Sequence, residues 1–264
     1  MAASASKALA KCLLDRTPRL KHYLLDQYKL RSFQWKMSSL GKFFKKFRSP
    51  ILFNNLDSLQ LASKVFGVDR GSSVLYYYMQ KFMERSEEHI QGRVLEVQES
   101  LFSRQFTHKD IQIDILHVEE GNPDATIVGD LTKASTLPEN QFDCFICTST
   151  FNHIFEIEKA IKTSHQLLKP GGVLIATMPC LAQIARYDMD RWGDYWRLTS
   201  KACEQLFTPV FGEGNVELIT YGNVLAAITE FQGISTEELP NPKLLDEFQK
   251  DYEVMTGIIA RKAL

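Results

Sequence analysis

The stretch Leu167-Leu-Lys-Pro-Gly-Gly-Val-Leu-Ile-Ala-Thr-Met178 decides the fold of this chain. Before it, apolar residues recur at helical spacing over residues 154–168, and after its Pro-Gly-Gly turn comes an apolar run at 173–178. A helical pattern that passes through a tight turn into a short apolar run is typical of a helix followed by a buried strand. The stretch therefore predicts one helix–strand unit of a parallel sheet covered by helices.

The same alternation continues on both sides of this stretch. Further strands are expected at residues 92–97, 111–118, 125–129, 142–148, 215–221 and 254–260. Further helices are expected at residues 74–90, 199–207 and 224–232. This order predicts an α/β fold with a doubly wound, mainly parallel, seven-stranded sheet and right-handed crossovers. We place the boundary of this domain, residues 74–264, after a basic and mainly helical N-terminal extension, residues 1–73.

Composition divides the chain into a basic arm and an acidic body. The 264 residues are 44% hydrophobic and 24% charged, which is ordinary for a globular protein. Residues 1–50 carry twelve Lys or Arg and two acids, whereas the remainder carries an excess of acids. Phe43, Phe44 and Phe47 share one side of a basic helical stretch, so the arm fits either an anionic membrane surface, a protein partner or docking onto the domain. Nucleic-acid binding is disfavoured because the acidic body would repel phosphate.

The five cysteines and the N-terminus bear on the compartment. Cys144 and Cys147 form a CxxC inside an apolar strand-like run, so we expect buried, reduced thiols rather than a zinc or redox site, and no metal cluster is evident. No run of about 18 apolar residues is present, and the start Met-Ala-Ala-Ser-Ala-Ser-Lys lacks a secretory core. We expect a cytoplasmic protein, membrane-peripheral if the arm binds lipid; the start is also consistent with an organellar transit peptide.

Acids fall close to the expected ends of three strands. Glu96 ends the first strand, Asp114 lies in the second and Asp130 follows the third. Ligands of doubly wound sheets bind beyond the carboxyl ends of the strands, where an acid after the second strand accepts hydrogen bonds from a ribose and an acid after the third can accept from an adenine amine. Each acid taken alone also fits an ordinary loop-end carboxylate. Their joint spacing, followed by Leu168-Lys-Pro-Gly-Gly172, is more specific.

At these positions the chain resembles the class I S-adenosylmethionine-dependent methyltransferases of the type 11 group. The resemblance rests on Val94–Val97, Gly129-Asp130, Leu137-Pro138 with Phe142-Asp143, and Leu167–Leu174. A narrower resemblance is to a mostly bacterial subgroup, often near or fused to glycosyltransferases. It rests on Asp114–His117, Gly121–Val128, Arg186–Thr199 and Tyr221–Ala227.

The resemblance implies S-adenosylmethionine as cofactor, in a pocket formed by Glu96, Gln98, Asp114, Asp130, Leu131 and Thr148. Gln98 stands where the family carries a glycine, and Glu99 adds a negative charge beside the expected methionine end of the cofactor. In the preceding helix, polar residues of the subgroup are replaced by Leu75, Tyr76 and Gln80. These departures indicate lost or altered cofactor binding, unless they are drift at positions that touch no ligand.

The Arg186–Thr199 segment is the expected substrate site, because aromatic rings with interleaved carboxylates suit a sugar or another polyhydroxylated acceptor. The candidates are Arg186, Tyr187, Trp192, Tyr195, Trp196 and Arg197. A salt-bridged lid is the other interpretation of this segment. The candidate bases for an O-methyl acceptor are His153, Asp190 and Asp194.

Two functions follow from these patterns. The first is an S-adenosylmethionine-dependent methyltransferase acting on a small-molecule or glycan-like acceptor. The alternative is a catalytically inactive methyltransferase-like module that binds a partner or membrane through residues 1–50. A nicotinamide oxidoreductase is disfavoured because no Gly-x-Gly-x-x-Gly follows the first strand.

Overall fold

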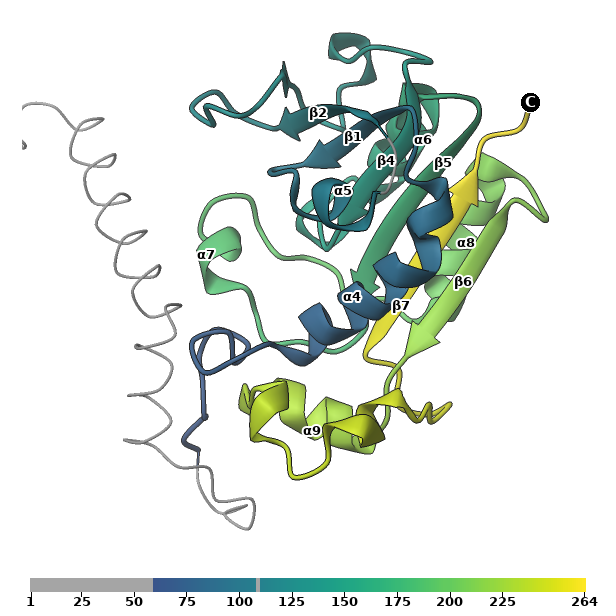
Figure 1. The fold of residues 1–264 in the computed structure, drawn as a ribbon. Coiled ribbons are helices and arrows are strands. Elements are labelled where there is room, and N and C mark those ends of the chain that lie inside the picture. Colours follow the sequence, from purple (N-terminus) through teal and green to yellow (C-terminus); the bar gives the residue numbers. More distant parts are fainter. Residues whose placement is uncertain (1–58, 108–109) are drawn as a thin grey trace, which may run out of the picture.

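A computed structural model describes residues 59–107 and 110–264 of the protein (Figure 1). In this part the chain forms one seven-stranded sheet with the order β3-β2-β1-β4-β5-β7-β6. β7 runs antiparallel to both of its neighbours, β5 and β6, and the other neighbouring pairs of this sheet are parallel. The strands are β1 (Arg93–Val97), β2 (Gln112–His117), β3 (Ile127–Val128), β4 (Phe142–Thr148), β5 (Leu168–Pro179), β6 (Val216–Tyr221) and β7 (Met255–Arg261). The predicted doubly wound, mainly parallel, seven-stranded sheet is therefore confirmed.

Helices cover both faces of the sheet (Figure 1). One face carries α4 (Val74–Ser86), α5 (Leu101–Phe106) and α9 (Val224–Gln232). The other carries α6 (Ile157–Leu167) and α8 (Ser200–Phe211), and the short α7 (Arg186–Met189) lies in the connection between β5 and α8. Short 3-10 turns are η1 (Glu87–His89), η2 (Ala134–Thr136), η3 (Phe151–His153), η4 (Thr236–Glu238) and η5 (Pro242–Asp246).

The alternation of side chains along β4 divides the core into two layers. Cys144 and Ile146 pack in the layer under α4 and α9, whereas Phe145 and Cys147 pack in the layer under α6 and α8. The two cysteines of the CxxC thus leave the strand on opposite faces and cannot share a ligand. Both are free thiols whose pKa is raised by burial, that of Cys147 to about 12. Within residues 59–107 and 110–264, no cluster of three or more metal-ligating side chains occurs.

The turn at Lys169-Pro-Gly-Gly172 differs from the expectation. These residues continue the ladder, so β5 starts at Leu168 and shifts register against β4 between Phe142 and Cys144. A Cβ on Gly172 would lie 2.9 Å from the carbonyl oxygens of Lys169 and Phe142. The glycine therefore allows two backbones to approach at an irregularity in the sheet.

The described end of the predicted extension packs onto the domain. The backbone N–H groups of Ala62 and Ser63 donate to the carbonyl of Gln232 at the end of α9. Arg70, buried, pairs with Glu238 at 2.7 Å. Residues 62–73 are thus part of the folded unit, rather than of a separate extension. The basic arm, residues 1–50 with Phe43, Phe44 and Phe47, lies outside the described residues.

No helix in the described ranges has both the length and the apolar character needed to cross a bilayer.

Candidate active site

A cavity of about 410 Å³ opens beyond the carboxyl ends of the parallel strands. Its walls are the residues that follow β1, the end of β2, the loop after β3, the residues that follow β4, and the connection between β5 and α8. This is the edge at which doubly wound sheets bind ligands. The predicted location of the site is the location of the cavity.

Glu96, at the end of β1, holds the first turn of the cavity. Its buried carboxylate accepts hydrogen bonds from the backbone N–H groups of Phe102 and Ser103, each at 2.9 Å. N–H groups in the first turn of a helix have no partner within the helix, so Glu96 caps the start of α5 by accepting from these two. Burial raises the pKa of Glu96, and the hydrogen bonds from Ser103 and Phe102 partly offset the rise.

Gln98 keeps the backbone shape that a glycine would give. Its φ is +73°, in the left-handed region. The backbone N–H of Gln98 donates to the carbonyl of Leu116 at 2.9 Å, and its own carbonyl accepts from Asn122 Nδ2 at 2.7 Å. The side chains of Gln98 and Glu99 are exposed and line the cavity. This turn therefore has a backbone conformation that glycine favours, although the residue is glutamine.

The loop after β3 and the end of β4 supply three predicted cofactor residues. Asp130, Leu131 and Thr148 all line the cavity. The carboxylate of Asp130 accepts from the N–H and Oγ1 of Thr132, both at 2.8 Å, and pairs with Lys133 at 3.2 Å. Burial alone would raise the pKa of Asp130, but the contacts with Thr132 and Lys133 hold it below its usual range.

Asp114 does not reach the cavity, and its prediction as the ribose-binding acid is wrong for this structure. It lies inside β2 and is buried, accepting from Arg93 Nε at 2.7 Å and Thr126 Oγ1 at 2.9 Å. The strand runs on to His117, which lines the cavity with its ring 6.4 Å from that of Trp192. An imidazole thus stands where an acid was expected. The expected end of this strand, at residue 118, lies one residue from His117 and was the signal that could have found it.

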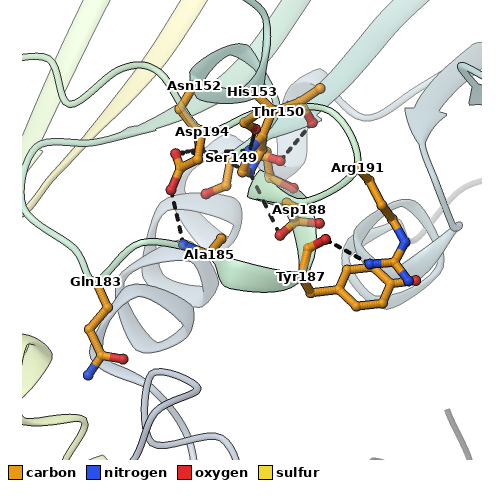
Figure 2. A network of polar contacts seen from close by, with 12 residues as sticks. Ser149, Thr150, Asn152, His153, Gln183, Ala185, Tyr187, Asp188, Arg191 and Asp194 are labelled. Atoms are coloured by element: carbon orange, nitrogen blue, oxygen red, sulfur yellow. Dashed lines mark hydrogen bonds and ion pairs between the residues drawn. The ribbon is translucent and has the colours of Figure 1, made fainter. Parts of the chain in front are cut away.

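His153 meets an acid that the sequence analysis did not select. His153 Nδ1 lies 2.8 Å from the carbonyl oxygen of Gly193, which only accepts, so Nδ1 carries the proton. Nε2 is then free to accept from Asn152 Nδ2 at 3.0 Å, and it lies 4.0 Å from Asp188 Oδ2 (Figure 2). Both His153 and Asp188 line the cavity. Burial raises the pKa of Asp188, which makes it a better proton acceptor than an ordinary exposed aspartate.

The two aspartates predicted as bases are placed elsewhere. The side chain of Asp194 is fully buried and makes two contacts with Arg197, at 2.6 and 2.7 Å. Burial alone would raise its pKa, but Arg197 and the N–H of Ala185 lower it to about 2, so Asp194 stays ionised and is no base. Asp190 is exposed, lies outside the cavity lining and faces Arg186 at 4.0 Å. Both predictions are therefore wrong. Helical spacing could have shown that Asp190 points away from the cavity. Residues four apart lie on the same side of a helix, so Arg186 and Asp190 share one side of α7 and Asp188 lies on the other.

The predicted substrate residues divide into two groups. Trp192 and Tyr195 line the cavity. The other four do not: Tyr187 lies under the guanidinium of Arg191, Trp196 stacks on Phe155 and donates to the carbonyl of Ile154, Arg197 pairs with Asp194, and Arg186 is exposed. For these four the placement contradicts the prediction and agrees with the lid interpretation. Phe155, which lines the cavity with 66% of its surface exposed, was missed.

Comparison with known proteins relates part of the chain to a family. Residues 54–176 match the family model described as "Methyltransferase domain". This match covers just under half of the chain and supports a class I S-adenosylmethionine-dependent methyltransferase. No curated protein sequence matches the chain.

Solved structures similar to the methyltransferase domain are distant in sequence. A putative sarcosine dimethylglycine methyltransferase from Galdieria sulphuraria is 14% identical, with a TM-score of 0.48 over 71% of this chain and 86% of the other. An S-adenosylmethionine-dependent methyltransferase from Archaeoglobus fulgidus is 11% identical, with a TM-score of 0.47 over 70% and 94%. The [4+2]-cyclase SpnF is 17% identical, with a TM-score of 0.47 over 88% and 94%. At this distance the likenesses do not bear on function.

A polar network holds the Arg186–Thr199 segment in place at the cavity (Figure 2). This segment is the roof of the cavity. Asn152 accepts at its backbone carbonyl from the N–H groups of Tyr195 and Trp196, and its side chain donates to Asp194 at 3.3 Å. Gly193 has φ +95°, and a Cβ there would overlap the Tyr195 ring. A glycine is therefore needed at this position for its own carbonyl to point at His153. The roof is therefore held in one conformation, in which Asp188, Trp192 and Tyr195 line the cavity.

The roof is also tied to the N-terminal side of the domain. Arg197 donates to the carbonyl of Gln183 at 2.8 Å, and Gln183 Nε2 donates to the carbonyls of Ser63 at 3.1 Å and Phe231 at 3.2 Å. A continuous set of contacts thus runs from Ser63 through Gln183 and Arg197 to Asp194.

Proposed function

We propose that this protein transfers the methyl group of S-adenosylmethionine to a small-molecule or glycan-like acceptor in the cavity. The observation that carries this proposal is the turn at Gln98, whose positive φ preserves the cradle that the family makes with glycine. Asp130, Leu131 and Thr148 line the same cavity at the ends of the neighbouring strands. The backbone shape and these side chains fit the cofactor, whereas His117 in place of the ribose acid, and Glu99 beside the expected methionine end, depart from the family's pattern.

The protein's part in the reaction is to bring the reactants together and to manage a proton. The cofactor, when bound, supplies a methyl group on a positively charged sulfur. Displacement at that carbon depends mainly on proximity and alignment, which the fixed roof provides. Asp188 and His153 face the cavity together, 4.0 Å apart, and would accept the proton that the acceptor loses.

Isothermal titration of the full chain with S-adenosylhomocysteine tests the proposal. We expect saturable binding, and we expect Asp130→Ala to weaken it about tenfold because a charge-assisted hydrogen bond is removed. Asp124→Ala is the matched control, since Asp124 is exposed and lies outside this cavity. Circular dichroism confirms that both variants fold. Absence of binding to the unmodified chain at millimolar ligand would overturn the proposal.

The second candidate function is an inactive binding module. It is favoured by one observation: the cavity has no acid from the end of β2, where His117 meets Trp192 instead. This function predicts no binding of the cofactor, and loss of a partner or of liposome association when residues 1–50 are deleted. Unchanged association after the deletion would count against it.

A further inference from the structure

The charged side chains of the cavity are of one sign. Among the described residues that form its lining, the ionised groups are Glu96, Glu99, Asp130 and Asp188, and neither Lys nor Arg is present. Two cations that adjoin lining residues in the sequence are already engaged: Lys133 pairs with Asp130 at 3.2 Å, and the guanidinium of Arg191 lies 3.5 Å from the centre of the Tyr187 ring. An acceptor that carries a carboxylate or phosphate would find no counter-charge among these lining residues, whereas a cationic acceptor would be attracted.

Three of these four carboxylates lie on the cofactor side of the proposed site, whereas Asp188 does not. Glu96, Glu99 and Asp130 follow β1 and β3, on the cofactor side of the proposed site. Asp188 comes from the roof, next to His153, and its side chain is 31% exposed toward the cavity. The acceptor side thus has its own carboxylate.

Aromatic rings accompany that carboxylate. Trp192 and Tyr195 come from the same segment as Asp188, and Phe155 packs edge-on against Tyr195 at 5.4 Å between ring centres. All three line the cavity, and Phe155 and Tyr195 are 66% and 49% exposed. Aromatic rings that line the same cavity as a carboxylate are surroundings that can stabilise an organic ammonium group, through cation–π attraction and a charge-assisted hydrogen bond.

We propose that the acceptor is an amine with an apolar body, bound as its ammonium form between Asp188 and the rings of Phe155, Trp192 and Tyr195. The inference rests on the proposed function and names its substrate class. In the reaction the ammonium gives one proton to the Asp188 carboxylate, and the freed nitrogen lone pair attacks the methyl carbon. The N–C bond forms as the C–S bond breaks, with its electron pair passing to sulfur. The products are the N-methylated ammonium and neutral S-adenosylhomocysteine.

Three probes of similar size and different charge test the proposal: phenethylamine, 2-phenylethanol and phenylacetate. Their binding to the full chain is measured by titration calorimetry, with and without S-adenosylhomocysteine. We expect phenethylamine to bind at least tenfold more tightly than 2-phenylethanol, and phenylacetate more weakly than either. Asp188→Asn removes the charge at nearly constant shape, and we expect it to abolish the preference for the amine while leaving the affinity for 2-phenylethanol within about twofold.

Asp190→Asn is the matched control, since Asp190 lies two residues away but outside the cavity, and we expect it to keep the preference. Equal binding of the alcohol and the amine, or a preference that survives Asp188→Asn, would overturn the proposal. A preference for glucose over glucosamine in the same titration would do so as well, in favour of a hydroxyl acceptor. Because the probes are titrated without cofactor too, failure of S-adenosylhomocysteine to bind rejects the proposed function separately from this inference.

Discussion

The side-chain amide of Asn122 donates to the backbone carbonyl of Gln98 at 2.7 Å, and so holds a non-glycine residue in the left-handed conformation. The two residues come from different loops, after β1 and after β2. A non-glycine residue in this conformation costs roughly 1–2 kcal/mol, which a local hydrogen bond of about 1 kcal/mol largely offsets. The turn therefore persists although its sequence has changed.

Replacing Gln98 by glycine should stabilise the protein. Glycine adopts positive φ without strain, and its larger entropy when unfolded offsets only part of that gain, so we expect about 0.5–1 kcal/mol of added stability. Urea denaturation measures it. Gln98→Ala is the control, because alanine keeps the strain; equal stabilisation by both variants would show that the left-handed turn is not the cause.

Asn122→Ala should have the opposite effect. It removes the donor that pairs with the Gln98 carbonyl, and we expect a loss of about 1 kcal/mol in the free energy of unfolding. The loss should shrink in the Gln98→Gly background, where less strain has to be held. A double-mutant cycle in urea measures this coupling, and strict additivity would contradict it.

Asp194→Asn should destabilise the roof of the cavity. The change leaves Arg197 with a weaker partner in a site where the aspartate is fully buried, and we expect a cost of about 3 kcal/mol. Because the pKa of Asp194 is about 2 in the folded protein, below its unfolded value, the contribution is complete above the unfolded pKa and is lost as pH falls through 2. The free energy of unfolding should therefore fall less steeply at acid pH in the variant than in the original protein. Denaturation across this range measures both effects.

Glu230 on α9 predicts a pH dependence of the opposite sense. The residue is 1% exposed, and burial raises its pKa to about 8, although a hydrogen bond with the backbone of Leu75 and the charge of Arg197 lower it in part. An unfolded chain ionises this group near pH 4.5, so stability should fall by about 1.4 kcal/mol per pH unit from there until pH 8 and then level off. Glu230→Gln should remove that slope. An unchanged profile in the variant would contradict the assignment.

Cys144 and Cys147 should be unreactive in the native protein. Both are fully buried, and burial raises the pKa of each thiol, so the thiolate is scarce at neutral pH. Peptide mapping after iodoacetamide treatment should find both unmodified until denaturant is added. A disulfide between them, or modification at the rate of a free thiol, would contradict their placement on opposite faces of β4.

The fold was predictable because each strand is short, apolar and bounded by turn residues. Buried strands such as β4 and β5 leave a continuous apolar run, and helices such as α6 leave a clear 3.6-residue spacing. The start of β5 was missed because Lys169-Pro-Gly-Gly172 has the composition of a turn, and only pairing with β4 makes it strand. Local sequence cannot show such a tertiary effect.

The site was predictable at the level of the strand ends and less so for single carboxylates. Asp130 and His153 follow the ends of β3 and β4 closely, and they line the cavity as expected. Asp114 and Asp194 were misplaced because a carboxylate is equally suited to a buried ion pair, and Asp190 because it points to solvent beside Arg186. The pairing of Asp114 with Arg93 joins two strands, so local sequence does not show it. The pairing of Asp194 with Arg197 spans three residues, and its spacing could have been noticed in the sequence.

The chain of contacts from Ser63 through Gln183 to Arg197 limits how the protein can be dissected. A fragment starting at Val74 would keep every strand, yet it would lose the carbonyl of Ser63 and the pairing of Ala62 with Gln232. The amide of Gln183 and the end of α9 would then be left partly unsatisfied beneath the roof. The smallest unit that can carry an intact cavity therefore begins before residue 62, upstream of every strand of the sheet.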